Sequence, residues 1–231
     1  LNKLLPSWNI QNCTLFDEDV FFSKVFSLDK KNIIDKISNN KPNYSPGWLY
    51  QQLLKLGASD VITNLEEKFL IWDADLLPVE SWPLTDNKKT KFALLQDKSS
   101  GNFEILNSWS SLIKNVLGIE PITDEKATFT SHHMFFEKKY LVSLKKRIQK
   151  YYNSKKNWID LLILATNTYG SMGEYWMYAS WVNSINKNDL NFYPYEKYGK
   201  NTERFYDDGN GLFSTNLKQN MGHDNLELFY P

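Results

Sequence analysis

A short apolar run that ends in two closely spaced carboxylates constrains the fold of this chain more than any other feature. Phe69 to Trp72 are apolar and favour β-structure, and Asp73 and Asp75 follow with one residue between them. An unbroken apolar run bounded by a breaker, here Pro78, is typical of a strand buried on both faces. In open α/β sheets, ligands bind beyond the carboxyl ends of the strands. We therefore expect both aspartates at a sheet edge that a ligand can reach.

Helical and extended patterns alternate along the rest of the chain. Ser45 and Pro46 form a typical helix start, and apolar residues repeat at helical spacing up to Gly57, which we expect to end the helix. Further helices are predicted over residues 29–37, 108–117, 137–152, 158–166 and 174–185, and short strands over 12–16, 92–95 and 127–131. The helix over 137–152 has a basic face, which we expect to be exposed. With no internal repeat or linker, we expect one α/β domain with a mixed central sheet flanked by helices.

Composition excludes several classes of function. The 231 residues include 27 basic and 27 acidic side chains, so no net charge attracts the chain to nucleic acid. Cys13 is the only cysteine, which excludes an internal disulfide framework and favours a reducing compartment. No apolar run is long enough to span a membrane, and no signal peptide is recognised. We therefore expect a cytoplasmic protein without a transmembrane segment.

The aspartate pair predicts a site for a hard divalent cation. The carboxylates of Asp73 and Asp75 can approach one ion, directly or through a water, and leave positions open for phosphate oxygens. Such an ion neutralises a diphosphate leaving group when a sugar leaves a nucleotide-sugar donor. This geometry would therefore serve a metal-dependent glycosyltransferase that moves a sugar to a hydroxyl acceptor.

Two other functions remain open for the same residues. A phosphatase of the haloacid-dehalogenase type would use Asp73 as nucleophile and Asp75 as acid, with Asp207 and Asp208 as its later acidic pair. Such enzymes usually carry Thr or Val where Leu77 stands here, and their motif lies near the chain start. The second alternative is a non-catalytic sugar-binding protein that retains a transferase fold. A further possibility is that both aspartates are surface turn residues and bind no ligand.

Four sequence blocks occur in an order that is typical of one family. They are PGWLYQQLLKLGAS (46–59), FLIWDADLLPV (69–79), TSHHMFFEKKYL (130–141) and GEYWMYASWV (173–182). In these blocks the chain resembles a largely uncharacterised family of bacterial and viral proteins that is grouped with the GT-A glycosyltransferases.

The resemblance implies a single GT-A domain, with a Rossmann-like nucleotide half over about residues 1–128 and an acceptor half over about 129–231. It also implies a UDP- or GDP-linked sugar donor, Mn²⁺ or Mg²⁺, and a carbohydrate or lipid-linked acceptor, with peripheral contact at the inner membrane surface. Residues 1–10 match the first strand of such a fold poorly. Either this strand is missing from the chain or it is disguised.

Further residues are candidates for the donor pocket. Gln52 and Lys55 lie on the helix of the first block, which we expect to pack beside the strand that ends at Asp73, so both are candidates for contact with the donor. The resemblance places His132 and His133 in the strand that lines the sugar pocket. Because adjacent residues of a strand point to opposite faces, at most one of these histidines should enter the site.

The remaining assignments concern the metal and the acceptor. By resemblance, His223 completes the metal shell of Asp73 and Asp75, a ligand set that suits Mn²⁺. The place of Glu174, after the sugar-pocket segment, resembles that of the catalytic or acceptor-binding carboxylate of GT-A enzymes. In an inverting transferase it would take the proton of the acceptor hydroxyl, and in a retaining one it would position sugar hydroxyls. Tyr175, which follows it, is expected to pack in the core or beside the acceptor.

Overall fold

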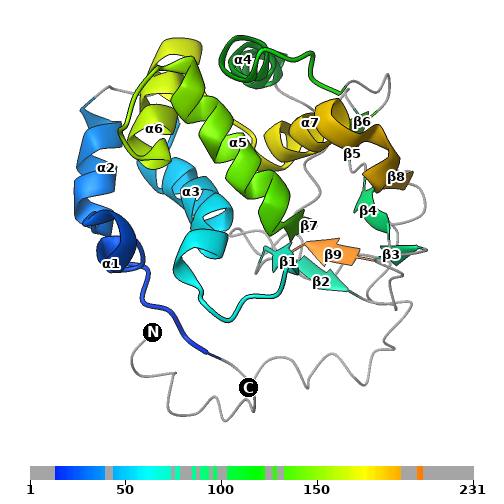
Figure 1. Ribbon diagram of the computed structural model, residues 1–231, viewed down its shortest axis with the longest axis horizontal. Coiled ribbons are helices and arrows are strands. Elements are labelled where there is room, and N and C mark those ends of the chain that lie inside the picture. Colours follow the sequence, from blue (N-terminus) through cyan, green and yellow to red (C-terminus); the bar gives the residue numbers. More distant parts are fainter. Residues whose placement is uncertain are drawn as a thin grey trace.

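Helices make up most of the described part of the chain, and short strands lie along one side of them (Figure 1). The computed structural model describes residues 14–39, 44–73, 76–78, 85–86, 89–93, 96–97, 103–122, 127–128, 133–193 and 202–204. The helices are α1 (Ser23–Phe26), α2 (Lys30–Ser38), α3 (Pro46–Val61), α4 (Phe103–Leu112), α5 (Lys138–Tyr151), α6 (Trp158–Tyr169) and α7 (Glu174–Asn186). A π-helix (Ile113–Leu117) continues α4, and a 3-10 turn (Lys187–Asp189) continues α7. The predicted α/β class is confirmed.

The strands form small ladders. They are β1 (Lys68–Trp72), β2 (Leu76–Pro78), β3 (Thr85–Asp86), β4 (Lys89–Ala93), β5 (Gln96–Asp97), β6 (Ala127–Thr128), β7 (His133–Glu137), β8 (Leu190–Tyr193) and β9 (Thr202–Arg204). Antiparallel pairs join β1 to β7, β2 to β9, β3 to β4 and β5 to β6, and β4 pairs in parallel with β8. Among the described residues, these ladders are not joined into one large sheet.

Strand β1 lies where the apolar run predicted it, but it is not buried on both faces. Phe69 is buried, whereas Leu70, Ile71 and Trp72 are half-buried. The strand is joined antiparallel to β7, whose residues are all buried or half-buried. Asp73 follows the last residue of β1, as expected.

Helix α3 is the central element of the core. It contacts α1, α2, α5 and α7, and its inner face buries Leu49, Leu53 and Leu56. The same face also buries two polar side chains, Gln52 and Lys55. Buried polar groups need partners, and a buried ammonium in particular is costly unless it is paired. The fold therefore has to bring acceptors to α3.

Gly57 does not end this helix, contrary to the sequence prediction. The helix begins at Pro46 as predicted but continues to Val61, so that Gly57 lies inside it. A Cβ atom at Gly57 would overlap the ring of Phe22. Gly57 is therefore needed for a close approach between α3 and the segment around α1, and not for a turn.

We expect Gly57→Ala to lower the free energy of unfolding by about 1–3 kcal/mol, the usual effect of forcing an extra carbon into a packed core. Urea denaturation would measure the change. Gly47→Ala is the matched control, because a Cβ there would meet only Ser45 Oγ, at 3.6 Å. That variant should be neutral or slightly stabilising. Equal stability of the two variants would contradict the packing role of Gly57.

The other predicted helices are confirmed, with differences at their ends. Asp29 caps α2 by accepting a hydrogen bond from the backbone of Asn32 at 2.6 Å. Helix α4 begins at Phe103, earlier than the predicted 108–117 range, and the π-helix after it ends before Gly118, whose φ is 66°. Of the predicted strands, β4 and β6 overlap 92–95 and 127–131, whereas residues 14–17 have no regular structure.

The basic face of α5 is only partly exposed, which corrects the prediction for one of its lysines. Lys145 is buried, and its Nζ lies 2.8 Å from Asp60 Oδ2 and 3.1 Å from Ser59 Oγ. Trp158 Nε1 donates to the same carboxylate at 2.9 Å. Burial lowers the pKa of the Lys145 ammonium, and Asp60 offsets only part of this effect. Lys146 and Lys150 are exposed, as predicted.

Candidate functional site

Three charged side chains from distant parts of the chain meet at the carboxyl end of β1. Lys55 Nζ lies 2.7 Å from Asp73 Oδ1 and 2.8 Å from Glu174 Oε1. The exposed fractions of the side chains of Lys55, Asp73 and Glu174 are 9%, 11% and 5%. One buried ammonium is thus shared by two nearly buried carboxylates.

Local structure explains why each group points to this place. Lys55 follows Gln52 by three positions on α3, so both lie on its buried face. Asp73 leaves the end of β1, and Glu174 is the first residue of α7. Gly173 precedes it, and a Cβ there would lie 2.5 Å from Cε3 of Trp109, so a glycine allows the start of α7 to pack closely.

Two neutral side chains complete what we call the buried charge cluster: Gln52, Lys55, Asp73, Glu174 and Tyr175. Tyr175 donates its hydroxyl to Asp73 Oδ1 at 3.0 Å, and Lys55 Nζ lies 4.6 Å from the centre of the Tyr175 ring. The Gln52 amide satisfies its neighbours when its oxygen accepts from Trp48 Nε1 at 3.2 Å and its nitrogen donates to Glu174. Every charged group of the cluster therefore has more than one partner.

The protonation of the cluster follows from its burial and its excess of carboxylates. Burial raises the pKa of Glu174, and the nearby Lys55 ammonium offsets part of that rise. Burial lowers the pKa of Lys55, but the carboxylates of Glu174 and Asp73 together more than offset this, so the pKa lies above its usual value. Lys55 thus stays charged at neutral pH. Glu174 binds a proton more readily than an exposed glutamate does.

The predicted donor-pocket residues divide into three groups. Gln52, Lys55 and Asp73 lie together in the cluster, beside Glu174. His133 is buried in β7 opposite Trp72, and the two ring centres are 5.4 Å apart, so it packs beside the end of β1. His132, the predicted metal ligands Asp75 and His223, and the acidic pair Asp207 and Asp208 of the phosphatase alternative lie outside the described residues.

The predicted metal shell can be tested against Asp73 alone. Among the residues that the structure describes, no group of three His, Cys, Asp or Glu side chains could hold a metal ion. Asp73 has the right chemistry for one ligand, a carboxylate at a strand end, but its Oδ1 contacts Lys55 and Tyr175. An ion at this carboxylate would lie near the Lys55 ammonium, so Asp73 would need further ligands to hold it.

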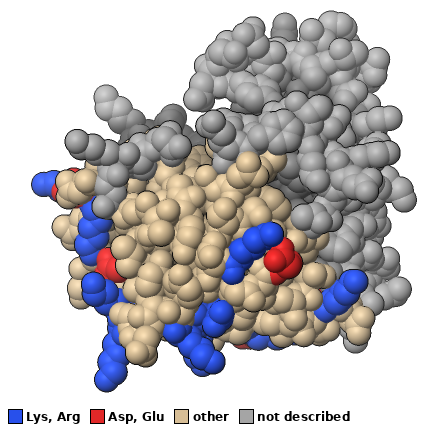
Figure 2. Space-filling model, turned by 90° about the horizontal axis from the view of Figure 1, so that it is seen from above, with Lys and Arg blue, Asp and Glu red and all other residues tan. Residues whose placement is uncertain are grey.

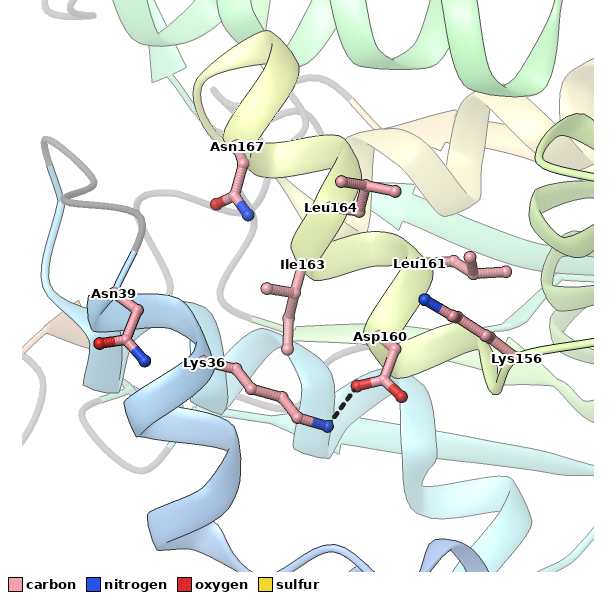
Figure 3. Close-up of a pocket in the computed structure, with 8 residues that line it drawn as sticks. All are labelled: Lys36, Asn39, Lys156, Asp160, Leu161, Ile163, Leu164 and Asn167. Atoms are coloured by element: carbon pink, nitrogen blue, oxygen red, sulfur yellow. Dashed lines mark hydrogen bonds and ion pairs between the residues drawn. The ribbon is translucent and has the colours of Figure 1, made fainter. Parts of the chain in front are cut away.

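An open hollow of about 430 Å³ lies apart from the predicted site residues, between α2 and α6 (Figure 3). Its wall includes Lys36 and Asp160, whose charged atoms are 2.7 Å apart, and the side chains of Lys156 and Leu164. No residue of the buried charge cluster lines it.

No helix in the described part of the chain has the length and apolarity needed to cross a membrane.

Tyr175 is the member of the cluster whose polar role the sequence did not indicate. It is buried, as expected, but its hydroxyl reaches a residue 102 positions away in the chain. A tyrosine on the apolar side of an aromatic helix is usually a packing residue. The one sequence feature that could have indicated this polar role is its position directly after Glu174.

Comparison with known proteins shows the family of the chain. The sequence profile described as "Family of unknown function (DUF6492)" matches residues 3–216, which is most of the chain. A search of curated proteins finds no match.

Proposed function

We propose that this chain, which belongs to DUF6492, a family of unknown function, is a metal-dependent glycosyltransferase. It moves a sugar from a UDP- or GDP-linked donor to a hydroxyl of a carbohydrate or lipid-linked acceptor, in the cytoplasm. Its fold is of the GT-A type, with a Rossmann-like donor half and an acceptor half. The order of the four sequence blocks supports the fold and the donor class.

One structural observation carries the proposal. Lys55, Asp73 and Glu174 come from three separate sequence blocks, and successive residues are 18 and 101 positions apart in the chain. Even so, a carboxylate oxygen of Asp73 and one of Glu174 each lie within 2.8 Å of the Lys55 ammonium. A buried arrangement with more carboxylates than cations costs stability, and such arrangements are typical of functional sites. A purely structural role would be served more cheaply by apolar side chains.

Each residue of the cluster has a role in this reaction. Glu174 accepts the proton of the attacking acceptor hydroxyl, because burial brings the pKa of its carboxyl closer to neutral pH. Gln52 orients that carboxylate through its amide nitrogen. Lys55 keeps Asp73 and Glu174 at a fixed separation.

In this proposal a metal ion would assist departure of the leaving group. When bound, a divalent ion would neutralise the charge that develops on the departing nucleoside diphosphate. Asp73 would be its ligand in the described part of the chain, together with Asp75 and His223, which lie outside that part. Tyr175 orients the Asp73 carboxylate by donating a hydrogen bond from its hydroxyl to Oδ1.

The test is donor binding and hydrolysis with Asp73→Asn. We expect UDP- or GDP-sugars with Mn²⁺ to raise the melting temperature of the wild type and to be hydrolysed slowly to the nucleoside diphosphate. Asp73→Asn should lose both effects, because an amide binds a divalent ion far more weakly than a carboxylate does. Differential scanning fluorimetry and detection of the released diphosphate would measure them.

Asp60→Asn is the matched control, because it makes the same change at another carboxylate that pairs with a buried lysine, Lys145. It should lose stability and keep donor binding. Full activity of Asp73→Asn would contradict the proposal. A phospho-aspartyl adduct on Asp73, mimicked by fluoroberyllate, would favour the phosphatase, and binding without turnover would favour a non-catalytic sugar-binding protein.

A further inference from the structure

One segment of the chain is strongly basic although the whole chain is neutral. Residues 138–159 contain eight Lys or Arg side chains and no Asp or Glu, in a chain with 27 basic and 27 acidic residues. This segment comprises α5 and the turn that leads into α6. A single-sign stretch of this length is a local source of positive potential.

Half of these cations have structural partners. Lys145 pairs with Asp60, and Arg147 Nε donates to the backbone oxygen of Leu117 at 2.7 Å. Lys139 pairs with Glu137 and Asp189. Lys138 reaches Glu67 at 3.8 Å and also donates to the Leu65 backbone oxygen. These four are accounted for by the fold.

The other four form what we call the basic surface: Lys146, Lys150, Lys155 and Lys156. All four are exposed, and none of them forms an ion pair with another residue that the structure describes. Lys146 and Lys150 are one helical turn apart on the outer face of α5, and the other two lie in the turn after it. Seen from above, several Lys and Arg side chains lie on the described surface, most of them toward its left and lower sides, with a few acidic side chains among them (Figure 2).

Apolar groups accompany these lysines. Val142 precedes Lys146 by one turn of α5 and is 43% exposed, and Tyr151, next to Lys150, is 39% exposed. Lys156 lines the hollow between α2 and α6, together with Leu164, which is 46% exposed (Figure 3). The basic surface therefore combines cations with scattered apolar and tyrosine side chains.

We propose that the basic surface docks the protein onto membranes that contain anionic phospholipids. Clusters of four or more basic side chains on a protein surface are attracted to the negative headgroups of such a membrane. The exposed tyrosine and aliphatic side chains suit the boundary between headgroups and acyl chains. The apolar face of α5 is buried in the protein core, through Leu141, Leu144 and Ile148, so α5 does not insert and docking is electrostatic and reversible.

Lipid is favoured over nucleic acid by the groups between the lysines. Nucleic acid binding without sequence preference combines basic side chains with aromatic rings on which bases stack. Tyr151 is engaged edge-on with Tyr152, with ring centres 4.8 Å apart, and its hydroxyl lies 3.0 Å from that of Tyr169. Val142 and Leu164 offer no stacking surface. This inference does not depend on the proposed transfer reaction.

Co-sedimentation with vesicles tests the proposal. The wild type should bind vesicles of phosphatidylcholine and phosphatidylserine, mixed at about 2:1, and not vesicles of phosphatidylcholine alone. Changing all four lysines of the basic surface to glutamine should weaken binding by about fivefold for each lysine, and so on the order of a hundredfold or more in total. Raising the salt from about 0.1 M to about 1 M should release the wild type, because the Debye length falls from about 10 Å to about 3 Å.

The matched control replaces four exposed lysines elsewhere, Lys24, Lys31, Lys114 and Lys187, with glutamine. It has the same net charge as the test variant and should bind vesicles nearly as well as the wild type. Equal losses in the two variants would reduce the effect to overall charge and overturn the proposal. So would equal binding to both kinds of vesicle, or salt-sensitive binding to single-stranded RNA without binding to vesicles. Thermal unfolding of each variant confirms that it is folded.

Discussion

Replacing Lys55 with methionine is expected to lower the free energy of unfolding by about 3–5 kcal/mol at neutral pH, the usual cost of removing one partner from a buried ion pair. Methionine has nearly the shape of the lysine side chain without its charge. It would leave the carboxylates of Asp73 and Glu174 side by side, both nearly buried and without the ammonium that they share. Urea denaturation of the wild type and the variant at pH 7 would measure the loss.

A second substitution separates charge from packing. Adding Glu174→Gln to Lys55→Met should restore part of the lost stability, because only Asp73 then remains as a charged group in the cluster. Lys146→Met is the matched control on the exposed face of α5, where no measurable change is expected. Without rescue by the second substitution, the effect of Lys55→Met would have to come from packing, and the assignment of a charge cluster would be wrong.

The loss in Lys55→Met should also depend on pH. Because burial raises the pKa of Glu174 in the folded protein, its contribution to stability falls as pH rises from the usual glutamate pKa of about 4.3 towards the raised value. Without Lys55, this pKa rises further. The stability difference between the variant and the wild type should therefore shrink as pH falls from 7 towards 4. The Lys55 contribution itself is fully present below the usual lysine pKa and is lost only as pH rises through its raised folded value.

Much of the cluster could be predicted because its members occupy simple local positions. Gln52 and Lys55 are three residues apart, which places them on one side of a helix whose apolar stripe marks its buried face. Asp73 follows an apolar run, and Glu174 begins an aromatic helix. Local patterns therefore predict which groups lie at the ends and inner faces of elements.

Which groups touch one another is set by packing between elements. The contact of Tyr175 with Asp73 depends on how α7 packs against β1 and α3, and no local pattern specifies that arrangement. Two errors of prediction had a readable cause. Gly57 lies four residues after Leu53, within the apolar stripe of α3, and a residue in such a stripe is rarely a helix end.

Lys145 shows the same cause. It lies four residues after Leu141 and three before Ile148, on the apolar side of α5, although its neighbours in the sequence are basic. The prediction of an exposed face followed the basic composition, whereas the helical spacing of Lys145 places it with the apolar residues. Spacing proved the better guide, since a lysine on an apolar stripe is buried when a carboxylate such as Asp60 can reach it.

Glu174→Gln is expected to slow the proposed transfer by about 10²–10⁴-fold, the usual contribution of a general base. Glutamine keeps the size of the side chain and cannot accept the proton. Stability should be unchanged or higher, because Lys55 retains Asp73 as its partner and the cluster loses its excess negative charge. Steady-state transfer rates and urea denaturation of the same preparation would measure both quantities.

The control is Glu137→Gln, which makes the same change at another buried glutamate. Glu137 pairs with Lys68 at 3.0 Å and Lys139 at 3.1 Å, so this variant should lose stability and keep its transfer rate. The two variants thus have opposite signatures: Glu174 is costly to the fold and needed for the reaction, and Glu137 is the reverse. Transfer at the wild-type rate by Glu174→Gln would remove this carboxylate from the chemistry. A large loss of stability in Glu174→Gln would instead make Glu174 a structural partner of Lys55. The proposed role requires the opposite, since a buried charge that destabilises the fold is retained only where function needs it.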